Sequence, residues 1–358
     1  MSPPVSPTPT SITAFLSKAA RGPLNKAVQI RGMLDYAAHY GEPAASQPLG
    51  RAVQLFFENG GGEAWVVRVG AYSSAAIGKG LGSLDKVETI NLICLPGIAD
   101  HKQATTLYAQ ALAYCETRRA MLLVDPPSVI TPDGAAQWIA DFTRTVHSAN
   151  AAAYFPWLLP ATPAKGEPPS CPPSGAVAGI FARIDKTRGV WKAPAGQEAT
   201  VSGIAGLAAN LTDAQNDALG QAGLNCLRTF PGKPPLVWGA RTLAGQGAEQ
   251  WKYVNVRRLS LFIEQSIDKG LQWVVFEPNG ETLWQAIRQT VGDFLFGLFR
   301  QGALMGTKPE QAYFVKCDAS TMTQADIDNG VLIIIVGVAP VRPAEFVIIT
   351  LRQLCRPA

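Results

Sequence analysis

The sequence predicts an α/β fold, with a mixed sheet flanked by helices and a smaller α/β unit at the C-terminal end. Segments typical of strands and helices alternate between residues 89 and 159, and a second series fills residues 251–358. The chain has 358 residues, of which 47% are hydrophobic, so it can bury a sizeable core. We therefore divide it into a proline-rich lead (residues 1–11), a central region (residues 12–250) and a C-terminal unit (residues 251–358).

The lead is rich in proline, serine and threonine, which predicts a polyproline-like or disordered segment outside the core. Residues 12–16 form an apolar strand-like run, and residues 52–57 repeat apolar side chains with a helical period. We expect that helix to end at Asn59-Gly60, because glycine adopts positive φ at little cost. The segment AWVVRV (residues 64–69) is then predicted to be a strand.

The middle of the chain alternates strands with helices. Strands are predicted at residues 90–96, 120–127 and 151–159, with helices at residues 102–118 and 135–148 between them. This order favours a parallel or mixed sheet with helices on its faces. A helix beginning at Pro173-Ser174-Gly175, a glycine- and alanine-rich connector over residues 195–225, and a hairpin formed by NCLRTF and PLVWGARTL complete this region.

The C-terminal unit is predicted to contain two helices and several strands. The helices cover residues 253–269 and 282–304, and Asn279 is placed to cap the second one. That helix carries an apolar stripe on one face. The predicted strands are LQWVVFEP, AYFVKC, VLIIIVGV and EFVIITLRQ.

Three aspartates crowd the stretch CDASTMTQADIDNGVLIIIVGVAP (residues 317–340). The DIDNG segment has a superficial likeness to a calcium loop, but the glutamate that such a loop requires further on is absent. Thr323 and Asp326 instead match a capping box for one helical turn, which Asn329-Gly330 would end. We therefore interpret the aspartates as part of a turn before a strand that is apolar on both faces.

No pattern in the sequence predicts catalytic, cofactor-binding or metal-ligating residues. The three histidines are scattered, no phosphate loop is present, and GKGLGS (residues 78–83) is only a loose glycine pattern. The six cysteines lack metal-ligand spacing and are expected to be buried free thiols. A nucleotide-binding α/β enzyme remains an alternative, supported only by the alternation of strands and helices.

The charge content bears on partners and location. Charged residues make up 16% of the chain, whereas soluble proteins average about 25%. This shortage suggests that much of the surface lies against other protein. The net charge of +4 is diffuse and does not indicate nucleic-acid binding. Because the sequence shows neither a signal peptide nor a long apolar segment, we expect synthesis in the cytoplasm and no membrane insertion.

Several segments together resemble the contractile tail sheath family of phage tails, tailocins and extracellular contractile injection systems. They are FFENGGGEAWVVRV, PPSGAVAGIFARIDKTRGVWKAPAG, VWGARTL, YVNVRRLSLFIEQSI, VFEPNGETLWQAI, AYFVKCDASTMTQADIDNG and GVAPVRPAEFVIITLRQ. They occur in the order expected for the family and extend over nearly the whole chain.

The resemblance implies a mechanical subunit rather than an enzyme. Sheath subunits stack as six-fold rings around an inner tube, in a metastable state on a baseplate, and then contract to drive the tube through a target envelope. The implied partners are further copies of the chain, the tube protein, and baseplate and terminator or cap proteins. The final location would be a phage tail or a released particle. A non-polymerising paralogue at the baseplate or the end of the sheath is the alternative.

The resemblance also implies particular interface residues. Terminal arms in this family lend strands to a neighbouring C-terminal sheet, so the candidate inter-subunit strand consists of Glu345, Phe346, Val347, Ile348, Ile349, Thr350, Leu351, Arg352 and Gln353. A helix of the C-terminal domain contacts the tube in this family, which makes Arg288, Arg300 and Lys308 the tube-facing candidates. The segment RGVWKAPAG (residues 188–196) is either an interface or a packed loop.

One departure from the family pattern concerns the N-terminal arm. Family members carry a strand about twenty residues before the SITAFL segment, whereas only MSPPVSPTP precedes Thr10 here. The donated N-terminal strand is therefore expected to be missing or reduced. Fewer linking strands, a shortened chain and a terminal paralogue are the three explanations.

Overall fold

The structure is a computed structural model, and it describes residues 3–43, 47–161, 170–245 and 247–343. It confirms the predicted mixed α/β fold. The central sheet has eight strands in the order β10-β9-β6-β5-β4-β1-β3-β2. The strands are β1 (Thr13–Ser17), β2 (Ala27–Ile30), β3 (Ala64–Arg68), β4 (Leu92–Cys94), β5 (Met121–Val124), β6 (Ala151–Phe155), β9 (Leu224–Arg228) and β10 (Leu236–Val237).

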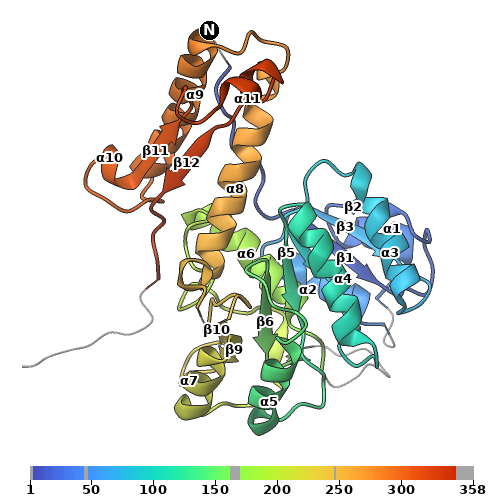
Figure 1. Ribbon diagram of the computed structural model, residues 1–358. Coiled ribbons are helices and arrows are strands. Elements are labelled where there is room, and N and C mark those ends of the chain that lie inside the picture. Colours follow the sequence, from blue (N-terminus) through green and yellow to red (C-terminus); the bar gives the residue numbers. More distant parts are fainter. Residues whose placement is uncertain (1–2, 44–46, 162–169, 246, 344–358) are drawn as a thin grey trace, which may run out of the picture.

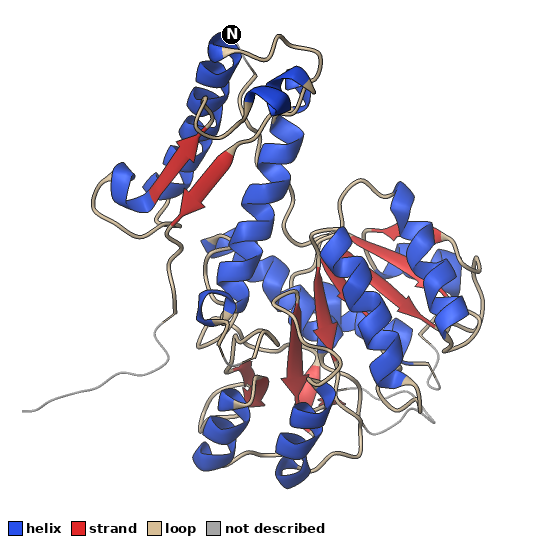
Figure 2. Ribbon diagram, viewed as in Figure 1, coloured by secondary structure: helices blue, strands red, loops and turns tan. Residues whose placement is uncertain are grey.

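The sheet is mixed because its inner strands run parallel and its two edge strands run antiparallel to their neighbours. The parallel register includes Phe15 opposite both Val66 and Cys94, while β2 pairs antiparallel with β3, and β10 with β9. Helices cover both faces, as Figure 2 shows. Burial on both faces explains why the parallel strands are continuously apolar rather than alternating.

Two helical layers enclose this sheet. On one face lie α1 (Met33–Tyr40), α2 (Pro48–Glu58) and α6 (Ser174–Arg188), which share a hydrophobic cluster with Phe15 and Tyr154. On the other face lie α3 (Ser74–Gly82), α4 (Ala104–Thr117), α5 (Pro132–Phe142) and α7 (Asp213–Gln221), which pack with residues such as Leu16 and Phe155. Successive residues of one strand therefore point into different layers, as the pleat requires.

The C-terminal unit stands apart from the sheet and is joined to it by a long helix (Figure 1). This helix, α8 (Val254–Gly270), packs beside α9 (Glu281–Arg300) and a two-stranded hairpin made of β11 (Tyr313–Lys316) and β12 (Ile335–Val338). Two short helices, α10 (Pro309–Ala312) and α11 (Gln324–Asp328), complete it. The predicted apolar stripe of α9 is confirmed, since Trp284, Ile287, Val291, Leu295 and Leu298 are all buried.

Several predicted elements were wrong. The connector over residues 195–225 contains β8 (Ile204–Leu207), which pairs with β7 (Leu158–Pro160), and also helix α7, capped by Thr212 and Gln215. Residues 271–278 form no strand but a 3₁₀ turn, η3 (Gln272–Val274), followed by a loop. The predicted strand over residues 331–338 is reduced to β12.

The lead is part of the C-terminal core, which corrects the prediction that it lies outside any core. Val5 and Thr8 are buried, and the segment runs beside α8 (Figure 1). The Thr8 backbone N–H donates to Ser266 Oγ over 3.1 Å, and Asn91 donates to the Pro9 carbonyl over 2.9 Å. Composition alone could not show this, because the partners of these polar groups lie about 80 to 260 residues further along the chain.

A buried carboxylate joins the end of β5 to the start of α6. Asp125 is fully buried, and it accepts hydrogen bonds from the Ser174 backbone N–H (2.8 Å) and hydroxyl (2.7 Å). Burial raises the pKa of Asp125 to about 7, even though the bonds from Ser174 oppose this shift. The carboxyl therefore binds its proton more tightly in the folded chain than in the unfolded chain.

Replacing this carboxyl should flatten one component of the pH dependence of stability. A raised pKa in the folded state contributes stability below about pH 4, and this contribution is lost as the pH rises through about 7. We expect Asp125→Asn to remove a slope of up to about 1.4 kcal/mol per pH unit from the free energy of unfolding. Urea unfolding at pH 5 and pH 8 measures this pH dependence, and the exposed Asp141→Asn serves as the control. An equal effect of Asp125→Asn at both pH values would contradict it.

Candidate assembly site

A groove separates α8 from the hairpin of the C-terminal unit. It has a volume of about 1170 Å³, and its walls come from α8, the loop before α9 and the segment that leads into β12. Alternate residues of that segment, Leu332, Ile334, Val336 and Val338, line one wall. Ile263 and Ile267 on α8 line the opposite wall. The groove therefore has two apolar walls, and polar residues such as Glu264 and Gln272 also line it.

Two exposed apolar side chains also line this groove. Val275 is 64% exposed and Phe276 is fully exposed. Within the described residues, β12 pairs only with β11, so its other edge carries unpaired backbone groups. An apolar groove beside an open strand edge is a template for pairing with another chain.

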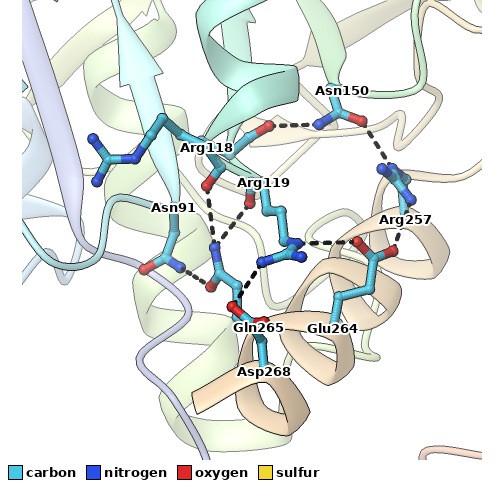
Figure 3. A network of polar contacts seen from close by, with 9 residues as sticks. Asn91, Arg118, Arg119, Asn150, Arg257, Glu264, Gln265 and Asp268 are labelled. Carbon is cyan, nitrogen blue, oxygen red and sulfur yellow. Dashed lines mark hydrogen bonds and ion pairs between the residues drawn. The ribbon is translucent and has the colours of Figure 1, made fainter. Parts of the chain in front are cut away.

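A polar network holds α8 against the central region (Figure 3). Arg119, just after α4, contacts Asp268 over 3.0 Å and Glu264 over 3.6 Å. Gln265 donates to the Arg119 carbonyl over 3.1 Å, and Arg257 donates to Asn150 over 2.8 Å. Arg119 has a φ of 52°, which turns the chain directly after α4 toward α8. The C-terminal unit is thus attached through side chains from one face of α8.

A second attachment is buried. The Arg258 guanidinium and the Asp185 carboxylate form a two-pronged pair at 2.9 and 2.5 Å, with side-chain exposures of 3% and 5%. Thr10 joins both partners, because its hydroxyl donates to Asp185 over 2.6 Å and its carbonyl accepts from Arg258 over 2.9 Å. The guanidinium also lies over the Phe181 ring. The lead, α6 and α8 therefore meet at one ion pair.

The three tube-facing candidates are not brought together into one patch. Arg288 lies against the hairpin, where it contacts the Cys317 carbonyl and pairs with Glu281. Arg300 is exposed at the other end of α9, and Lys308 is exposed at the start of α10. Arg288 and Arg300 are twelve positions apart, which on an α-helix is about 18 Å along the axis and about 120° around it.

The aspartates of residues 317–340 serve the turn, as predicted. Thr323 and Asp326 form a reciprocal capping box on α11, and Gly330 follows with a φ of 70°. Hydrogen bonds from Ser320 and Thr323 lower the pKa of Asp318 and Asp326, respectively. The described residues hold no group of three or more His, Cys, Asp or Glu side chains placed to bind a metal ion.

Other predictions for this unit have mixed outcomes. The candidate strand Glu345–Gln353 lies outside the described residues. Asn279 does not cap α9; its side chain accepts from Trp284 and donates to the Val331 carbonyl. Cys94, Cys115, Cys171, Cys226 and Cys317 are buried free thiols, as expected. Throughout the part of the chain that the structure describes, each helix is too short or too polar to cross a membrane.

Sequence reasoning missed the groove itself. Ile263, Ile267 and Leu271 recur with helical spacing and could have indicated a second apolar stripe on α8. That stripe cannot be distinguished in the sequence from one that faces the protein's own core. The exposed Phe276 lies in the segment LQWVVFEP, which was predicted from the sequence to be a strand.

Comparisons with known proteins place the chain in a family. The profile of the phage tail sheath protein central domain matches residues 71–243, and that of the phage tail sheath C-terminal domain matches residues 246–353. The chain belongs to the phage tail sheath family. This confirms the resemblance carried by the sequence motifs.

Solved tail sheath assemblies share the whole fold. The anti-feeding prophage (AFP) helical sheath in its contracted state aligns with a TM-score of 0.84 and 32% identity, over 98% of this chain and 95% of that chain. The PVC sheath complex, from an extracellular contractile injection system in its contracted state, aligns with a TM-score of 0.82 and 29% identity, over 98% and 94% of the two chains.

Two curated tail sheath proteins match over shorter stretches. The protein of Vibrio phage KVP40 is 27% identical over 177 residues, and that of Burkholderia phage BcepMu is 30% identical over 144 residues. These matches span 49% and 38% of this chain but only 25% and 30% of the two relatives. The homologues are structural sheath proteins of phage tails and contractile injection systems.

Proposed function

We propose that this chain is the structural subunit of a contractile sheath. It stacks as six-fold rings around an inner tube and contracts to drive that tube through a target envelope, without enzymatic activity. The observation that carries this proposal is the alignment over 98% of the chain with a sheath subunit in its contracted state. The subunit is made and assembled in the cytoplasm and ends in a phage tail or released injection particle.

The groove and the open edge of β12 support an exchange of strands between subunits. Residues 345–353 of a neighbouring subunit would pair with β12 and cover α8. A strand of nine residues spans about 30 Å. Its alternate residues Val347, Ile349 and Leu351 match the alternating apolar row that lines the groove. Backbone pairing of this kind persists while other contacts between subunits change.

The remaining assignments follow from this role. Residues 251–358 act as the C-terminal sheath unit, residues 12–250 as the central region and residues 1–11 as a lead packed on α8. Arg288, Arg300 and Lys308 contribute to the tube-facing surface, and the further partners are baseplate and terminator or cap proteins. The glycines of GKGLGS support no phosphate site, because residues 78–82 lie within helix α3.

A second candidate is a paralogue located at the baseplate that does not itself polymerise. A chain of the AFP baseplate structure aligns with a TM-score of 0.83 and 31% identity, over 99% of this chain and 96% of that chain. Such a subunit would form rings without extending into a sleeve. Electron microscopy separates the two candidates by the length of the assembled particles.

Removing residues 345–358 should abolish polymerisation and leave the subunit folded. We expect the full chain to form ridged sleeves with its tube protein, and the shortened chain to remain as single particles in negative-stain electron microscopy. Unfolding midpoints for both chains provide the control for folding. Sleeves formed by the shortened chain would refute the strand exchange. A full chain that never assembles with its tube protein would refute the sheath role.

A further inference from the structure

A second hollow lies at the other end of α8, and none of the roles above uses it. It has a volume of about 800 Å³, within the range of binding pockets, and it is lined by residues 191–196, β9 and the start of α8. Trp191, Trp238 and Tyr253 give it aromatic walls, and Trp238 is 38% exposed. The RGVWKAPAG segment therefore forms part of a pocket as well as a packed loop.

This pocket carries an unused acceptor. Asn255 lines it and is only 2% exposed, and its side-chain oxygen has no hydrogen-bond partner. Its amide nitrogen is already engaged, because it donates to the Trp191 carbonyl over 2.8 Å. A buried acceptor without a donor is costly, but five other buried side-chain atoms of the described residues share this state, so the oxygen alone does not identify a ligand.

The pocket is also positively charged. Arg188, Lys192, Arg241 and Arg342 line it together with the Asp217 carboxylate, and Arg188 is paired with Glu198, which leaves a smaller net positive charge. The Lys192 ammonium donates to the Ala193 and Ala195 carbonyls, and burial lowers its pKa. An acidic group carried by an aromatic or aliphatic segment would complement both the walls and the charge.

A segment with this chemistry lies at the opposite end of α8. Residues 275–277 read Val-Phe-Glu; Phe276 is fully exposed, and its backbone has a φ of 72°. A left-handed conformation is unfavourable for a bulky residue, and an exposed phenyl ring gains nothing from burial to offset that cost. The Glu277 backbone N–H donates to the Val274 carbonyl over 3.1 Å, so the turn holds Phe276 outward.

We propose that residues 275–277 of one subunit insert into this pocket of a second copy. Phe276 would lie among Trp191, Trp238 and Tyr253, and Glu277 would face Lys192. This inference rests on the proposed sheath role and adds a contact that the strand exchange does not supply.

The geometry favours a head-to-tail contact. The pocket includes Tyr253 and Asn255 at the beginning of α8, while the loop follows the end of α8. A helix of 17 residues is about 25 Å long, so the two surfaces are well separated on each subunit. A loop and a pocket at opposite ends form a heterologous contact, which builds a closed ring or an open helical filament according to the rotation between successive subunits.

Disulfide trapping between two different variants tests the contact directly. One protein carries Phe276→Cys and the other carries Trp238→Cys, both with Cys355→Ser. Under mild oxidation we expect crosslinked dimers in the mixture and none in either protein alone. Leu34→Cys replaces Phe276→Cys in the control, because Leu34 is 89% exposed and lies outside both surfaces. Equal crosslinking with the Leu34 variant would overturn the proposal.

Charge reversal provides an independent test of the same contact. We expect Glu277→Lys to raise the concentration needed for assembly by about tenfold. Lys192→Glu should act similarly, and the double variant should recover assembly close to that of the original chain. Phe276→Ser should weaken assembly without lowering the unfolding midpoint, because the ring is fully exposed; since Phe276 also lines the groove, the crosslink and the charge reversal assign the effect to the pocket. The matched control is Leu34→Ser.

The outcomes separate this inference from the sheath role. A chain that assembles, yet shows no crosslink in the mixture and no effect of Phe276→Ser, refutes the loop-and-pocket contact alone. A chain that never associates refutes the sheath role together with this contact. Recovery in the double variant supports direct contact between Glu277 and Lys192, because a folding defect in either single variant would not be repaired by the other.

Discussion

Replacing Gly179 by valine should force α2 and α6 apart and lower the free energy of unfolding by about 3 kcal/mol or more. A Cβ atom at Gly179 would lie 2.3 Å from the Phe56 carbonyl oxygen, and one at Gly175 would lie 2.2 Å from the Ala52 carbonyl oxygen. Both contacts are with backbone rather than with a flexible side chain. The two helices therefore have no local way to accommodate a larger residue.

Urea unfolding of the two chains measures this effect, and Gly292→Ala is the matched control. Gly292 lies inside α9, and a Cβ there meets nothing within 4 Å. We expect that substitution to stabilise the subunit by roughly 0.5–1 kcal/mol, because alanine favours a helix over glycine. A loss below about 1 kcal/mol for Gly179→Val would show that α2 and α6 are not held at this distance.

The sequence predicted most elements of the central region because their signals are local. Strands buried on both faces read as apolar runs, and Asn59-Gly60 ends α2 as expected, with Gly60 at a φ of 109°. The prediction of a connector over residues 195–225 was wrong because the signals of its elements are weak. Helix α7 buries only Leu219 among its residues, so its apolar period is too weak to be recognised, although its capping box is present.

The assembly site was less predictable because it depends on contacts between distant segments. Residues 271–278 are apolar enough for a strand, but they form a 3₁₀ turn and a loop, and no strand of the described residues pairs with them. The burial of Val5 against Gly270 depends on a contact across the whole chain, where a Cβ on the glycine would lie 2.8 Å from the valine side chain. Periodicity reports which residues are apolar but not which surface covers them.

Replacing Arg258 by methionine should cost about 3–5 kcal/mol, because it leaves the Asp185 carboxylate buried without its counter-charge. The Thr10 hydroxyl would remain as a donor, but one hydrogen bond does not replace a two-pronged ion pair. Urea unfolding measures the loss. Arg144→Met, which breaks an exposed pair with Asp141, should cost at most about 1 kcal/mol.

The double variant Arg258→Met with Asp185→Leu decides whether charge or packing causes the loss. If the unpaired carboxylate is responsible, removing it should recover part of the stability lost in the single variant. If the double variant loses as much free energy of unfolding as the two single variants lose together, the lost packing of Arg258 on Phe181 causes the effect instead. Either result bears on assembly, because this pair joins the lead and α6 to the helix that positions the groove at one end and the pocket at the other.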